Sequence, residues 1–151
     1  AVFDSQNLNA RGAMQVASCM AGVAFLKGLG LVHSISHAIG AEYGTHHGLT
    51  NAITLPAVMR FNAPSIRDKC PEISKALELE GQDFDDIYDW ICRLLDYLEI
   101  PKSLDEIGVD KTKVSSLAKR AFSDSATGTN PRKPELEELE VVLREAISQG
   151  R

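Results

Sequence analysis

The sequence contains few cysteines and no long, uninterrupted apolar run. Three cysteines, Cys19, Cys70 and Cys92, are scattered among 151 residues and form no CxxC pair. An odd, unclustered set predicts no disulfide framework and suits a reducing cytoplasm, where we expect the protein. Lys27 interrupts the longest apolar stretch, so no run of about 18 apolar residues occurs and no membrane-spanning helix is predicted.

An excess of positive charge is also missing. The net charge is −5, which argues against nucleic acid or an anionic membrane as a partner. The charge is uneven: residues 1–62 carry +1 and the remainder carries −6. We therefore expect residues 1–62 to form mainly the interior and the functional site, and the remaining residues to form a solvated exterior.

Strand-like alternation is absent, whereas helical periodicity recurs along the chain. This periodicity predicts that residues 1–151 form a single all-α domain of seven or eight helices. The helix over 9–27 is apolar on most faces, so we expect it to be central and packed all round, with Cys19 as a small core residue. Pro56 predicts either a kinked helix over 48–61 or two shorter helices. The other expected helices span 31–43, 71–79, 84–98, 110–122 and 135–148.

All four histidines lie between Gly28 and Asn62. His33 and His37 are four residues apart in a helix-compatible run, so both imidazoles project from one face. A turn-like break then leads to His46 and His47 before a second apolar run. The residues alone leave two interpretations open: a metal or catalytic site, or ordinary surface and core histidines.

The same stretch carries a family resemblance. Residues 28–62 read GLGxVHxxxHxxGAxxxxxHGxxNAxxLPxVMRFN, with x for any residue. This pattern resembles the iron-containing (group III) alcohol dehydrogenases. Residues 10–25, 100–109 and 129–132 also resemble that family, so the resemblance covers essentially the whole chain.

The resemblance implies a fold, a metal site and a reaction. The fold would be the multi-helix, bundle-like, metal-binding C-terminal domain, which is similar to that of dehydroquinate synthase. His33 and His47 match two metal ligands of the family, for Fe²⁺ or Zn²⁺. His37 matches a histidine that faces the substrate as a pocket wall or proton relay, and Phe25 and Ala126 match pocket residues. His46 stands where the family commonly has proline, and we assign it no role.

The sequence lacks two other parts that the resemblance implies. No Asp-x3-His pair occurs, although the family has two further ligands in that arrangement, and no glycine-rich nicotinamide-binding motif occurs. We therefore expect a fragment that lacks the N-terminal dinucleotide-binding domain. NAD(P) would bind through that domain, which is the expected partner, together with a small alcohol or aldehyde substrate. A homo-oligomer is an open possibility.

Three functions remain open. The first is oxidation of a primary or secondary alcohol to an aldehyde or ketone, or the reverse. The second is a related activity, such as that of a maleylacetate reductase or a glycerol dehydrogenase. The third is a non-catalytic, all-helical interaction module with incidental histidines.

Overall fold

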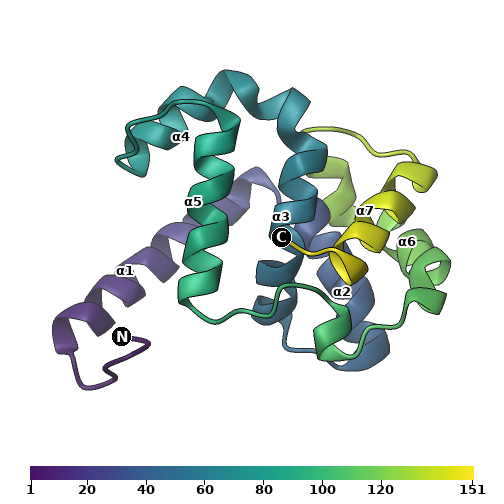
Figure 1. Ribbon diagram of the computed structural model, residues 1–151, viewed down its shortest axis with the longest axis horizontal. Coiled ribbons are helices and arrows are strands. Elements are labelled where there is room, and N and C mark those ends of the chain that lie inside the picture. The colour runs from purple at the N-terminus through teal and green to yellow at the C-terminus, as the bar shows by residue number, and fades with distance from the viewer.

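The computed structural model describes residues 1–151 and contains helices and no strand, which confirms the all-α prediction. Seven α-helices are joined by short 3₁₀ segments (Figure 1). The α-helices are α1 (Leu8–Ala24), α2 (Leu31–Tyr43), α3 (His47–Ile66), α4 (Cys70–Ala76), α5 (Phe84–Tyr97), α6 (Val114–Phe122) and α7 (Leu136–Ser148). The 3₁₀ segments are η1 (Phe25–Lys27), η2 (Arg67–Lys69), η3 (Asp105–Ile107), η4 (Lys111–Lys113) and η5 (Ser125–Thr129).

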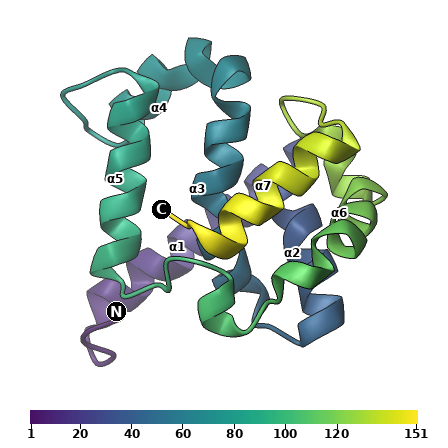
Figure 2. The same cartoon turned by 45° about the vertical axis from the view of Figure 1, so that its right-hand side comes forward.

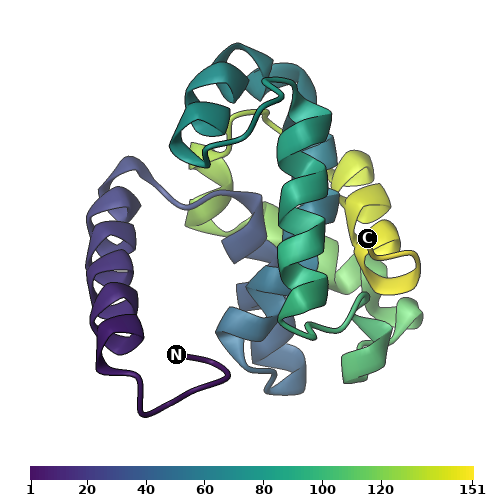
Figure 3. The same cartoon turned by 60° about the vertical axis from the view of Figure 1, so that its left-hand side comes forward.

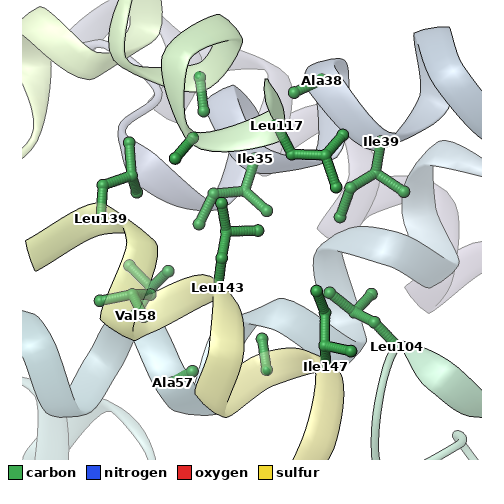
Figure 4. Packing of buried hydrophobic residues seen from close by; sticks show 14 of the residues in the cluster. Ile35, Ala38, Ile39, Ala57, Val58, Leu104, Leu117, Leu139, Leu143 and Ile147 are labelled. Atoms are coloured by element: carbon green, nitrogen blue, oxygen red, sulfur yellow. The ribbon is translucent and has the colours of Figure 1, made fainter. Parts of the chain in front are cut away.

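Helices α2, α3, α6 and α7 form the body of the molecule, and α2 contacts both α3 and α6 (Figure 2). Their apolar faces meet in one core of 19 buried residues. Figure 4 shows Leu143 of α7 pointing toward Ile35 of α2, and Ile147 of α7 beside Leu104; Val58 of α3 belongs to the same cluster. Burial of an aliphatic side chain of this size contributes about 1.5–3 kcal/mol, so this core fixes α2 and α3 relative to each other.

A loop from the C-terminal part of the chain anchors the start of α2. Gly28 and Gly30 have φ of +100° and +111°, and a Cβ at Gly28 would lie 2.5 Å from Thr129. Glycine is therefore required here for both its backbone freedom and its small size. The side chain of Asn130 accepts a hydrogen bond from the buried backbone N–H of Leu31 at 3.1 Å. The N-terminus of α2 is thus capped by an acceptor from a residue far along the sequence.

Helices α4 and α5 form a smaller layer against the end of α3. Phe84 and Ile87 of α5 pack with Ala63 and Cys70 in a second buried cluster. Asp83 and Asp86 form a capping box at the start of α5, so the aspartates there stabilise the helix terminus. Asp83, Asp85, Asp86 and Asp89 are all exposed, so this acidic run lies on a solvated helix face.

The prediction that the first helix is central and packed all round is wrong. Helix α1 forms, and Asn7 caps it, but none of its residues is buried. It lies apart from the body in Figures 1 and 3, and nothing lies within 4 Å of a Cβ placed at Gly12 or Gly22. Cys19 is exposed and is not a core residue. Apolar composition favours burial only where another element is present to cover the helix.

The third helix is longer than expected. It continues through both Pro56 and Pro64 to Ile66, so the alternative of two shorter helices is wrong. Each proline removes one backbone donor. Phe61, Asn62 and Ala63 are buried, and this tertiary packing stabilises the last turns despite the lost hydrogen bond.

No single helix is both long and apolar enough to cross a membrane. Only the segments Leu8–Lys27 and Leu31–Tyr43 pass that test together, and they are bent by 102° at their junction.

Candidate metal and substrate site

Three of the four histidines come together where α2 runs beside the start of α3. The ring centroids of His33 and His47 lie 5.3 Å apart, and those of His33 and His37 lie 6.1 Å apart. The His37 ring stacks on that of His47, with centroids 5.4 Å apart and an angle of 15° between the planes. The helical spacing of His33 and His37, together with the packing of α2 on α3, produces this cluster.

The amide of Asn51 lies between two of the imidazoles. Its Nδ2 is 3.1 Å from Nε2 of His47 and 3.3 Å from Nε2 of His33. The two Nε2 atoms therefore face one common position. The Asn51 Oδ1 atom is buried and has no hydrogen-bond partner. Asn51 follows His47 by four residues on α3, so helical spacing alone could have identified it.

His33 is held in its neutral form by its surroundings. Burial, followed by repulsion from His47 and His37, lowers the pKa of its imidazole below the ordinary value, against a weaker opposing effect of Asp124. A neutral imidazole has a free lone pair and is the form that ligates a metal ion.

Sequence reasoning missed a carboxylate that holds His37. Asp124 precedes η5, and its Oδ2 lies 3.0 Å from Nδ1 of His37. Burial alone would raise the pKa of Asp124, but hydrogen bonds from the Ala126 N–H and from His37, with the His37 charge, lower it. Asp124 is therefore an anion that accepts a hydrogen bond from Nδ1–H of His37. This leaves Nε2 of that ring without a partner from Asp124.

The other predicted site residues are placed as follows. Phe25 is 55% exposed, and its ring meets that of His33 edge-on at 5.5 Å. Ala126 is buried in η5 and donates its N–H to Asp124. His46 is the N-cap of α3, where its Nδ1 accepts from Leu49 N at 3.3 Å. His46 therefore has a structural role that the sequence did not indicate.

The clustered histidines do not by themselves form a complete metal site. No three His, Cys, Asp or Glu side chains are arranged to hold a metal ion. Two neutral nitrogens facing one position fit half of the donor set that a catalytic Fe²⁺ or Zn²⁺ requires. The histidine cluster lines none of the surface pockets of the molecule.

Comparison with known proteins identifies the family. A family described as "Fe-containing alcohol dehydrogenase family, C-terminal" matches residues 1–147. The NADPH-dependent butanol dehydrogenase of Clostridium saccharobutylicum is 35% identical over 143 residues, which cover 89% of this chain and 37% of that protein. The NAD-dependent methanol dehydrogenase of Bacillus methanolicus is 35% identical over an alignment of 157 positions, which covers 97% of this chain and 40% of that protein.

The fold gives the same result. The crystal structure of 1,3-propanediol oxidoreductase matches with a TM-score of 0.89 and 33% identity, over 94% of this chain and 39% of that one. The chain thus spans about two fifths of the length of the relatives that it matches. The family match over residues 1–147 and the similarity of the fold show that this chain belongs to the Fe-containing alcohol dehydrogenase family and corresponds to its C-terminal part.

Proposed function

We propose that this chain is the metal-binding part of an alcohol dehydrogenase that interconverts a primary or secondary alcohol and its aldehyde or ketone. The observation that carries the proposal is the convergence of Nε2 of His33 and Nε2 of His47 on one position, at 3.3 and 3.1 Å from Asn51 Nδ2. Membership of an enzyme family favours this function over that of a non-catalytic interaction module.

The positions of the residues suggest a separate role for each. His33 and His47 would hold Fe²⁺ or Zn²⁺, which supplies Lewis-acid polarisation of the alcohol oxygen. His37 stands beside them, and its Nε2 is free to accept and pass on the hydroxyl proton, since Asp124 holds Nδ1. Phe25, beside His33, and Ala126, next to Asp124 in sequence, would provide apolar walls around the substrate.

The remaining parts of the site would come from a preceding region of a longer protein. We infer that this region includes a dinucleotide-binding domain for NAD(P) and two further metal ligands, because the relatives are more than twice as long as the matched region. Helix α1 supports the inference, since Met14, Val16, Met20 and Val23 are all more than half exposed. An exposed apolar helix of this kind is typical of a surface that another part of the protein covers.

The 151-residue chain alone is expected to bind metal weakly and to turn over no alcohol. Two neutral imidazoles bring no negative charge to a divalent cation, and hydride transfer needs a bound acceptor. Metal analysis after dialysis should give well below one equivalent, and NAD(P)-linked assays on a panel of alcohols should give no rate. Added Zn²⁺ should shift the NMR signals of His33 and His47 before those of His46. Tightly held, stoichiometric metal would show that the chain completes the site alone and would contradict the proposal.

Thiol labelling tests the predicted cover over α1. In the isolated chain, Cys19 should react fastest with an alkylating agent at pH 8, because it is exposed. Cys70 should react slowest, because it is buried and burial raises the pKa of its thiol, which lowers the fraction of reactive thiolate. Mass spectrometry of labelled peptides measures all three rates.

In the longer protein the rate of Cys19 alkylation should fall at least about 10-fold. This corresponds to about 1.4 kcal/mol in the free energy needed to expose the thiol. The Cys92 thiol, half-buried on α5, provides the internal comparison. An unchanged Cys19 rate would show that the preceding region does not cover α1.

A further inference from the structure

The hydroxyl of Ser36 has two partners, and both belong to His47. Ser36 Oγ lies 3.2 Å from the backbone oxygen of His47 and 3.0 Å from Nδ1 of its ring. A carbonyl oxygen only accepts hydrogen bonds, so Ser36 donates its one hydroxyl hydrogen to it. Only lone pairs of Oγ remain for the ring, and Nδ1 must therefore carry the hydrogen and donate it.

The other side of the ring agrees with this assignment. Nε2 of His47 lies 3.1 Å from Nδ2 of Asn51, and an amide NH₂ group only donates. Nε2 is therefore the acceptor in that contact and carries no hydrogen. The Ser36 contact fixes the same tautomer by itself, so the assignment does not depend on the orientation of the Asn51 amide.

We propose that Ser36 is a positioning residue that holds His47 in the Nδ1–H tautomer and aims the Nε2 lone pair at the position shared with His33. A ligating histidine needs its second ring nitrogen hydrogen-bonded to fix tautomer and orientation. Ser36 is 1% exposed, so water does not compete for Nδ1. Helix α2 thus supplies one ligand, His33, and also orients the ligand on α3. The metal-binding consequence rests on the proposed function, whereas the tautomer does not.

The experiment is ¹⁵N NMR of the histidine rings in the metal-free chain at pH 8. In the parent chain, Nδ1 of His47 should show the shift of a protonated ring nitrogen, and Nε2 that of an unprotonated one. In Ser36→Ala this pattern should move toward the Nε2–H tautomer. Ser36→Thr keeps the hydroxyl and should keep the parent pattern.

Ser34→Ala is the matched control. Ser34 is also buried on α2, and its hydroxyl bonds to Gly30 and Thr127 instead of a histidine. Ser34→Ala should lower the free energy of unfolding by about as much as Ser36→Ala does, and it should leave the His47 tautomer unchanged. In Zn²⁺ titrations, Ser36→Ala should bind about 10–100-fold more weakly than Ser34→Ala.

Two results would overturn the assignment of Ser36: a parent chain with hydrogen on Nε2 of His47, or a Ser36→Ala variant with the parent pattern. The parent measurement needs no variant, so it decides the tautomer even if Ser36→Ala does not fold. A result in which Ser36→Ala changes the tautomer but Zn²⁺ never perturbs His47 would support the role of Ser36 and overturn the metal-binding function of His47.

Discussion

Replacement of His33 or His47 by alanine, in the longer protein that carries this chain, is expected to abolish both bound metal and activity. Each change removes one of the two nitrogens that face the common position beside Asn51. Loss of the Lewis acid removes several kcal/mol of transition-state stabilisation. A loss of about 4 kcal/mol corresponds to about 10³-fold in kcat, so we expect at least that decrease. Metal analysis and steady-state kinetics on the same preparations measure both effects.

His46 and His37 provide the comparisons. His46→Ala should retain metal and activity and cost about 1 kcal/mol of stability, because His46 only caps α3. His37→Ala should lower activity more than metal content, since its Nδ1 bonds to Asp124 and its ring lies beside the proposed ligands without sharing their contact to Asn51. A His47→Ala protein with full metal content and activity would remove the basis of the proposed site.

The helices could be predicted largely because local signals determine where they begin and end. Glycine and proline separate the periodic segments, and the predicted range 31–43 coincides with α2. The environment of α1 could not be predicted in the same way. Its composition is that of a packed helix, yet burial depends on elements that lie beside it in space, and none does.

The histidine cluster could be predicted, but most of the groups that orient it could not. The spacing of His33 and His37 places them on one face, and the resemblance adds His47. Asp124 contacts His37 across 87 residues of sequence, and no local pattern marks that pair. Ser36 is an ordinary small polar residue in the sequence, and only the packing of α2 against α3 gives it two bonds to His47.

Asn130→Ala is expected to cause the largest loss of stability among single polar substitutions in this chain. The Asn130 side chain accepts from Leu31 N and from Asn62 Nδ2, and it donates to Asn62 Oδ1 and to the Arg132 backbone oxygen. Alanine would leave the Leu31 N–H and both ends of the Asn62 amide buried and unpaired. Each such group costs about 1–3 kcal/mol, so we expect a loss of about 3 kcal/mol or more in the free energy of unfolding.

Urea denaturation followed by circular dichroism measures this loss. Asn7→Ala is the matched control, because Asn7 also bonds to a helix N-terminus, at Ala10 N, but in an exposed position. Water replaces that bond, so its loss should cost about 1 kcal/mol at most.

The double variant Asn62→Ala with Asn130→Ala then separates two causes. If unpaired amide groups dominate the cost, the double variant should lose at least about 1 kcal/mol less than the sum of the two single losses, because it removes both partners of that pair. Strict additivity would show instead that Asn130 stabilises the protein mainly through Leu31 and Arg132. Either result leaves α2 dependent on the loop after η5, because the Leu31 N–H has Asn130 as its hydrogen-bond acceptor. Asp124 caps the start of η5 and Asn130 follows its end, so the attachment of this segment to α2 keeps the Asp124 carboxylate within reach of His37.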